Sequence, residues 1–305
     1  SFKDQVIFEK DEILKPDARP YTVYTPYLNA WLRKYYKQKA LPVRLVRPEN
    51  FFQIKPCSVP SPRSIGFEIT DSPDPVPSID EFVIKNYKAN RDLPSKEGTS
   101  RLSVHLRFGT VSVRELVRIA SQISETWLKE LVWREFFMML LYHFPMVVNH
   151  SFRKKYDNIN WRNNEKEFEC WCRGETGYPL VDAGMRQLNA TGWMHNRVRM
   201  VTASFLVKHL LIDWRWGEAY FAEKLIDYDL AVNNGNWQWV AGSGADAAPY
   251  FRIFNPLTQQ QKFDPDFDYI KKWIPGFKPG YITPIVDHDF ARQRALTELK
   301  RVVGG

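Results

Sequence analysis

Hydrophobic residues recur at helical spacing through most of this chain, from about residue 79 onward. Over 112–123, Leu116 and Val117 belong to an apolar side of the kind that a helix buries. A longer helix is predicted over 127–142 and ends before Pro145, because proline cannot continue a helix. Further helices are predicted over 29–38, 178–187, 197–211, 219–225 and 287–302.

The first part of the chain has a different pattern. Residues 5–9 predict a short strand, and 11–26 hold three prolines and are predicted to be a loop. Eight prolines then crowd between residues 42 and 77, where a helix cannot extend far. We therefore predict a mainly α fold in three parts, which are a C-terminal remnant of an α/β domain, an interdomain linker and an all-helical domain, over 1–30, 31–78 and 79–305. Because the chain starts at Ser1 and is already in mid-domain there, we expect an N-terminal portion to precede it.

The charge of the chain points to its partners. A formal net charge of +8 and a pI of about 9.2 favour an anionic partner such as nucleic acid. A basic protein without such a partner remains the alternative. Six basic residues and no acid lie between residues 33 and 47, and this run is either a solvated face or a nucleic-acid contact.

Cysteine count and hydropathy bear on the compartment. The chain has three cysteines, an odd number without the spacing of a disulfide framework, which favours a reducing compartment. Cys170 and Cys172 lack a second Cys/His pair at zinc spacing, so no metal site is predicted. The longest apolar run, 136–148, is interrupted by His143 and Pro145 and is too short to span a membrane. We expect a cytoplasmic protein that does not enter membranes.

The densest candidate chemistry lies in residues 227–239. These thirteen residues hold two carboxylates, four side-chain amides and two tryptophans. A solvated loop would not keep two indoles, and an ordinary core helix would not keep so many polar side chains. The mixture suits a pocket that hydrogen-bonds the edge of a large planar ring and places a redox-active aromatic side chain beside it.

A second candidate site lies on the helix predicted over 127–142. Trp127, Glu130 and Arg134 fall at positions i, i+3 and i+7 and so share one helical face, with Trp133 at its margin. The face pairs an acid and a base with two indoles. The alternative is an i, i+4 ion pair beside two core tryptophans.

Two further segments carry polar groups that suit an anion. Residues 98–103 combine a glycine with three hydroxyl side chains at the start of a helical region, where phosphate is stabilised, although N-capping is the commoner use of Ser and Thr. In 194–200, Asn196, Arg199 and Met200 share one face, and Arg197 turns aside toward a phosphate. The alternative there is an ordinary basic helix, with His195 a structural histidine.

Together, in this order and at these separations, the motifs resemble those of the DNA photolyase/cryptochrome family. The resemblance covers about residues 20–302 and is closest to the microbial class I cyclobutane pyrimidine dimer photolyases. Their form of the motif at 194–197 is Met-His-Asn-Arg, whereas a (6-4) photolyase is expected to show a histidine pair there. Asn233 also favours a repair enzyme. In the family this position faces the flavin N5, and plant-type and insect-type cryptochromes carry Asp or Cys there.

The resemblance implies three groups of site residues. Those that bind FAD are expected to be Tyr87, Thr99, Ser100, Arg101, Leu102, Ser103, Trp127, Glu130, Arg134, Asn196, Arg199, Asp227, Asp229 and Asn233. Those that contact DNA and the lesion are expected to be Arg91, Trp133, Asn196, Arg197, Met200, Trp239 and Arg252. An electron relay is expected to run outward through Trp237, Trp214 and Trp161, each of which is otherwise a core residue.

Within these groups the resemblance also implies individual roles. Glu130 would hydrogen-bond a flipped-out pyrimidine dimer, and Trp133 and Trp239 would stack against it. Arg199 would pair with Asp227 beside the isoalloxazine ring. The arginines outside the pocket would contact DNA phosphates, where charge neutralisation supplies much of the affinity.

The implied function is light-dependent DNA repair by a deoxyribodipyrimidine photo-lyase. Reduced FAD would donate an electron to a cyclobutane pyrimidine dimer in DNA, the ring would split, and the electron would return. The alternatives are a cryptochrome-like blue-light photoreceptor with little repair activity and a nucleic-acid-binding fragment without catalysis. We expect a monomer. In the family the N-terminal α/β domain helps to hold an antenna chromophore of folate or deazaflavin type, and we do not expect that chromophore here, where most of the domain is missing.

Overall fold

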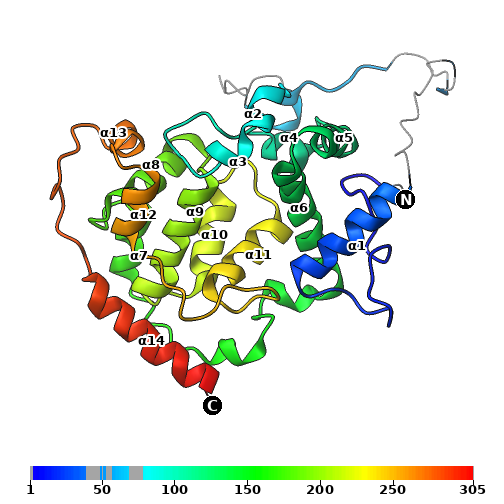
Figure 1. Cartoon of the computed structure of the whole chain (residues 1–305). Coiled ribbons are helices and arrows are strands. Elements are labelled where there is room, and N and C mark those ends of the chain that lie inside the picture. Colours follow the sequence, from blue (N-terminus) through cyan, green and yellow to red (C-terminus); the bar gives the residue numbers. More distant parts are fainter. Residues whose placement is uncertain (1–2, 39–48, 50, 53–56, 69–77, 305) are drawn as a thin grey trace.

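A computed structural model describes residues 3–38, 49, 51–52, 57–68 and 78–304, and Figure 1 shows them as an assembly of helices. The predicted mainly α fold is confirmed. Up to residue 143 the α-helices are α1 (Tyr24–Lys37), α2 (Glu81–Lys85), α3 (Tyr87–Asn90), α4 (Ser103–Phe108), α5 (Val113–Ile123) and α6 (Glu125–His143). The later ones are α7 (Glu165–Arg173), α8 (Pro179–Thr191), α9 (Asn196–Ser204), α10 (Trp214–Lys224), α11 (Leu230–Ala241), α12 (Pro256–Phe263), α13 (Asp268–Trp273) and α14 (His288–Gly304). Shorter turns of 3-10 helix are η2 (Pro62–Ile65), η3 (Pro145–Val148) and η4 (Lys154–Asn158).

The prediction of a strand over 5–9 is wrong. The backbone N–H groups of Ile7 and Phe8 donate to the carboxylate of Glu135 on α6, at 2.7 and 3.1 Å, and not to a partner strand. Trp31 on α1 donates its indole N–H to the same carboxylate at 2.8 Å. A short apolar run between polar residues does not distinguish a strand from a bent segment whose N–H groups bind a side chain. As a result the first residues share one apolar core with α1, α5 and α6.

Two serines fix the starts of α5 and α6. The hydroxyl of Ser112 accepts from the N–H of Glu115, and the hydroxyl of Ser124 accepts from the N–H of Trp127, each at 3.4 Å. Such caps satisfy N–H groups that have no partner within the helix. The predicted helices over 112–123 and 127–142 are therefore present, and α6 is longer by two residues at its start and one at its end.

The predicted helix over 197–211 is divided. The α-helix α9 ends at Ser204, and the wider π-helical segment η5 (Phe205–His209) follows it. Within η5, Lys208 is buried and donates from Nζ to the carbonyl of Ala241, at the end of α11, at 2.9 Å. A widened turn has the same hydrophobic periodicity as an α-helix over a few residues, so the pattern alone did not reveal it.

Helix α11 lies at the centre of the molecule and packs against α6, α9 and α10 (Figure 1). Its Ala231 belongs to the core of α1, α5 and α6, whereas Trp237 belongs to a second core built from α7 to α10. Asp229 caps it by accepting from the N–H of Val232 at 3.1 Å. The sequence patterns did not predict α7, α11, α12 and α13. Polar pocket residues interrupt the hydrophobic periodicity of α11, and the other three helices are too short to show one clearly.

Candidate FAD and lesion site

A cavity of about 490 Å³ lies between α6, α9, α11 and the segment that precedes α4. The predicted site residues that line it are Tyr87, Arg91, Thr99, Ser100, Arg101, Leu102, Ser103, Trp127, Glu130, Trp133, Arg134, Asn196, Arg199, Met200, Asp227, Asp229, Asn233, Trp237 and Trp239. Four predicted residues, Arg197, Arg252, Trp161 and Trp214, are not part of its described lining. Ligand sites have volumes of about 300–1,000 Å³, so the size suits a large organic cofactor.

On α6, the predicted shared face of Trp127 and Glu130 points into this cavity. Glu130 accepts from Nη1 of Arg91 at 2.5 Å, so its ion pair is with a residue beyond α3 and not with its i, i+4 neighbour Arg134. The pKa of Glu130 is raised above its ordinary value, because burial outweighs the opposing effect of the Arg91 guanidinium. The hydrogen bond from Arg91 holds the carboxyl group in place at the wall of the cavity.

Arg134 lines the cavity, but its guanidinium is bound elsewhere. Nη1 donates to the carbonyl of Gln5 at 2.6 Å, and Nη2 donates to the Gln5 side chain and to the carbonyl of Leu106 at 3.1 and 3.2 Å. These bonds tie the N-terminal segment and α4 to α6. In this structure the contacts assign Arg134 a structural role, and they leave fewer of its donors for a cofactor than we expected.

The segment before α4 supplies the hydroxyl side chains of the cavity. Gly98 is required there, because a Cβ at this position would lie 2.6 Å from Cβ of Asn90. Helix α4 begins at Ser103, and its cap residue Leu102 makes no side-chain cap. The hydroxyls of Thr99 and Ser100 therefore do not cap α4. Both residues line the cavity instead.

On α9, the predicted ion pair is present. Arg199 donates from Nη2 to Oδ2 of Asp227 at 2.9 Å and from Nε to the carbonyl of Met194 at 2.7 Å. The other oxygen, Oδ1 of Asp227, is buried without a hydrogen-bond partner in the described chain. A buried acceptor without a partner is costly. Because Asp227 lines the cavity, its carboxylate fits a cofactor with N–H groups along a ring edge.

His195 stands just before α9 and accepts at Nδ1 from the N–H of Arg197 at 3.2 Å. Burial lowers its pKa to about 4, so the ring is neutral at pH 7. This is the structural histidine that we predicted, used as a helix cap.

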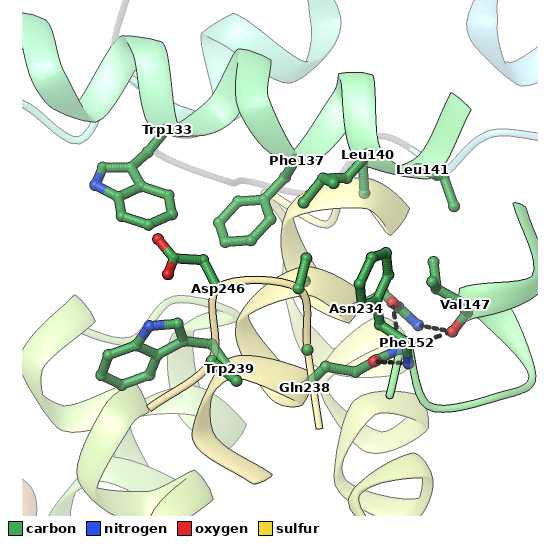
Figure 2. Close-up of a pocket in the computed structure, with 15 residues that line it drawn as sticks. Trp133, Phe137, Leu140, Leu141, Val147, Phe152, Asn234, Gln238, Trp239 and Asp246 are labelled. Atoms are coloured by element: carbon green, nitrogen blue, oxygen red, sulfur yellow. Dashed lines mark hydrogen bonds between the residues drawn. The ribbon is translucent and has the colours of Figure 1, made fainter. Parts of the chain in front are cut away.

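The four amides of 227–239 divide into two groups. Asn233 and Asn236 line the cavity. Asn233 donates from Nδ2 to the Glu218 carboxylate at 2.9 Å, and Asn236 donates to the carbonyl of Val232 at 2.8 Å. Asn234 and Gln238 instead donate to the carbonyl of Val147, at 3.0 and 2.9 Å, on the other side of α11 (Figure 2). Their role is to hold η3 against α11, so only part of this polar stretch belongs to the cavity.

A smaller cavity of about 30 Å³ adjoins the main one and shares Trp133, Phe137 and Trp239 with it. Figure 2 shows the carboxylate of Asp246 between the indoles of Trp133 and Trp239. Trp133 also stacks on Tyr24, with ring centroids 3.5 Å apart and 9° between the planes. One face of the Trp133 indole is thus covered by α1, which restricts how a base can stack on it.

The three predicted relay tryptophans occupy different depths. Trp237 lines the cavity, Trp214 is buried in the core of α7 to α10, and Trp161 is half-buried where that core meets the one beside α14. A Cβ at Gly217 would lie 2.1 Å from the Trp237 ring, so α10, which begins at Trp214, packs directly on that indole. Trp171, which the sequence did not single out, lies 6.2 Å from Trp237 between ring centroids.

The predicted phosphate-binding arginines differ from one another. Arg252 is exposed. Arg197 is half-buried, donates from Nη2 to Oδ1 of Asp92 at 2.8 Å and lies over the Phe263 ring. The sequence analysis identified neither Asp92 nor Glu218. Asp92 pairs with Arg197, 105 positions away, and Glu218 with Asn233, 15 positions away, and no local motif marks either pair.

The described residues contain no group of three or more His, Cys, Asp and Glu side chains arranged to hold a metal ion. Among the helices that the structure describes, none is both long and apolar enough to cross a membrane.

Comparisons with known proteins agree with this geometry. Residues 127–279 match the family model for the FAD binding domain of DNA photolyase. The chain is 40% identical to the deoxyribodipyrimidine photo-lyase of Alkalihalophilus pseudofirmus, over 98% of this chain and 72% of that protein.

Solved structures show the same relationship. A bacterial class III photolyase from Agrobacterium tumefaciens aligns with a TM-score of 0.82 and 37% identity, over 100% of this chain and 73% of that one. A cryptochrome from Synechocystis sp. aligns with a TM-score of 0.74 and 27% identity, over 96% of this chain and 70% of that one. The chain therefore belongs to the DNA photolyase/cryptochrome family, among the deoxyribodipyrimidine photo-lyases, and its function is light-dependent DNA repair.

Proposed function

We propose that this protein splits cyclobutane pyrimidine dimers in DNA, with FAD in the 490 Å³ cavity. The observation that carries the proposal is that one cavity contains both the Glu130–Arg91 pair with two indoles and the Arg199–Asp227 pair with Asn233. The first group suits an uncharged lesion that presents hydrogen-bonding pyrimidine edges. The second suits the polar edge of a flavin.

The FAD site uses residues that the fold holds rigidly. Thr99, Ser100 and Ser103 would hold the phosphates and the ribityl chain. The free Oδ1 of Asp227 would accept from the flavin ring edge, with Arg199 balancing its charge. When bound and reduced, FAD supplies the absorption of light and the electron that opens the cyclobutane ring, and it takes the electron back.

Asn233 has its orientation set by Glu218. The same Asn233 atom lies 2.9 Å from the Glu218 side chain and 3.1 Å from the Glu218 backbone carbonyl. A carbonyl oxygen only accepts hydrogen bonds, so this atom is the amide nitrogen. The oxygen of the Asn233 amide is then the group available as an acceptor toward the flavin. An amide does not deliver an acidic proton, which favours the anionic reduced flavin that repair requires.

The lesion would enter beside α6. Glu130 would accept from a pyrimidine N–H, and Arg91 would keep that carboxylate ionised. Trp239 and the uncovered side of Trp133 would contact the dimer, and Met200 would pack against it. Trp237, Trp214 and Trp161 would pass electrons inward to oxidised flavin and restore its reduced form.

Repair of a thymine-dimer oligonucleotide by the FAD-loaded, reduced protein under blue light tests this proposal. Light-dependent recovery of intact thymines, absent in a dark control, is the expected result. A normal bound-flavin spectrum without recovery would instead support a cryptochrome-like photoreceptor, the second candidate, which the alignment with the Synechocystis protein favours. A preparation that binds DNA but no flavin would contradict both.

A further inference from the structure

Four charged side chains of alternating sign form a chain that leads away from the cavity. Arg197 donates from Nη2 and Nε to Oδ1 of Asp92, at 2.8 and 3.2 Å. The same Oδ1 lies 3.9 Å from Nε of Arg91, whose Nη1 donates to Glu130 at 2.5 Å. The order is therefore Arg197, Asp92, Arg91, Glu130, and it connects α9 to α6 through the residues that follow α3.

The geometry makes Asp92 the link in this chain. It is the most exposed of the four, with 39% of its side chain accessible, against 18% for Arg197 and 25% for Arg91. Arg197 is also fixed by the Phe263 ring, 4.5 Å from its guanidinium carbon. One carboxylate thus holds two arginines in place and offsets part of the positive charge that they present to solvent.

That charge matters because phosphate attraction does not depend on sequence or damage. Each phosphate that a protein neutralises releases counterions and adds affinity for any DNA. An arginine already paired with a carboxylate gains less from a phosphate than a free one. A lesion that enters the cavity has contacts with Glu130 and the indoles as well, and undamaged DNA does not.

Resting on the proposed function, we propose that Asp92 is a specificity-determining positioning residue. By pairing with Arg197 and Arg91 it weakens binding to undamaged DNA. By holding Arg91 toward Glu130 it keeps the lesion-binding carboxylate in its place. Both effects raise the ratio of affinities for dimer-containing and undamaged DNA.

The test is Asp92→Asn, measured as the dissociation constants of the FAD-loaded full chain for one duplex with and without a thymine dimer. We expect undamaged DNA to bind about threefold to fivefold more tightly, the scale of a partly exposed ion pair. For undamaged DNA, the logarithm of the association constant should fall more steeply with the logarithm of salt concentration. The added slope should be up to about that of one phosphate contact. Affinity for damaged DNA should stay the same or fall, because Arg91 is no longer held toward Glu130, so the ratio of the two affinities should drop at least about threefold.

Two sets of variants separate this role from net charge and from folding. Glu169→Gln removes a charge from an exposed ion pair with Arg173 on α7, outside the cavity lining, and should leave the ratio unchanged. In Arg197→Gln protein, adding Asp92→Asn should have a smaller effect on undamaged DNA than in the wild-type background. Flavin content reports whether each variant folds.

An unchanged ratio in Asp92→Asn, or an equal shift in Glu169→Gln, would overturn the role of Asp92. If Asp92→Asn lost its flavin, Arg197→Gln would serve as the test. An equal loss of affinity for both DNAs would support the inference, and a loss of affinity confined to damaged DNA would oppose it. The proposed function has a separate readout in wild-type protein. Wild type that repairs dimers while Asp92→Asn keeps full discrimination refutes only this inference, whereas wild type without any preference for damaged DNA refutes both.

Discussion

The carboxylate of Asp246 accepts a hydrogen bond at 2.9 Å from the backbone N–H of Tyr24, a residue 222 positions earlier in the chain. Tyr24 is the first residue of α1, whose own cap residue Val23 makes no side-chain cap. A residue from the loop after α11 therefore caps α1, and the same loop forms part of the wall beside Trp133 and Trp239 (Figure 2).

Asp246→Ala should lower the free energy of unfolding by about 1 kcal/mol, because an N–H of the first turn loses its acceptor and the helix dipole loses a favourable charge. Urea unfolding followed by circular dichroism measures this. Glu223→Ala removes an exposed acid paired with Lys224 and should change stability much less. Equal stability of the two variants would show that the cap contributes nothing.

Glu130→Ala should lower the yield of dimer repair about tenfold or more, because a charge-assisted hydrogen bond contributes about 1.5–3 kcal/mol. Flavin content should stay near wild type, since Arg199 and Asp227 are unaffected. Repair quantum yield and the flavin spectrum measure the two effects. Glu125→Ala, on the same helix but exposed and paired with Lys129, is the control. Loss of flavin in Glu130→Ala would refute the assignment of Glu130 to the lesion.

Trp237→Phe should slow photoreduction of oxidised flavin, while repair by chemically reduced enzyme persists. The reason is that Trp237 is the one member of the predicted relay that lines the described part of the cavity. Flash photolysis gives the rate. Trp171→Phe is a matched control, because this buried indole lies 6.2 Å from Trp237 but outside the predicted relay. Photoreduction that slows only in the control would show that electrons reach the flavin through α7.

Lys208 predicts a dependence of stability on pH. Burial lowers the pKa of its ammonium from 10.5 to about 7. Between these values the unfolded chain binds a proton that the folded chain does not, so stability should rise with pH, by at most about 1.4 kcal/mol per pH unit.

Urea unfolding from pH 7 to pH 10 measures this slope, and Lys208→Met should remove most of it. Lys224→Met, at an exposed lysine, should retain it. The same slope in both variants would mean that another group titrates in this range.

Much of the site could be predicted from sequence, because its residues fall into short segments with local regularities. A helix places Trp127 and Glu130 on one face through spacing alone, and both side chains line the cavity. The predicted pair of Arg199 and Asp227 is also present. Family resemblance supplied this pairing, since the two residues are 28 positions apart and no periodicity connects them.

The errors have a common physical origin. Within residues 5–9, Ile7 and Phe8 donate their N–H groups to Glu135, which is 128 and 127 positions further along, and not to a strand. Two pairings that no sequence pattern predicted have the same origin: Arg134 binds Gln5, and Glu130 binds Arg91. In each case a charged side chain on α6 found a partner that only the folded chain brings near.

The sequence by itself determined the mainly helical class, the presence of α5 and α6, and the chemical groups available to the cavity, because these depend on periodicity and composition within a few residues. Only the tertiary structure decided how those groups are paired. It turned Asn234 and Gln238 away from the cavity, gave Asn233 its partner Glu218, and joined Asp92 to two arginines. Hydrogen bonds and ion pairs require their two groups to lie within about 3–4 Å of each other. Packing of the folded chain, and not spacing in the sequence, decides which distant residues come that close.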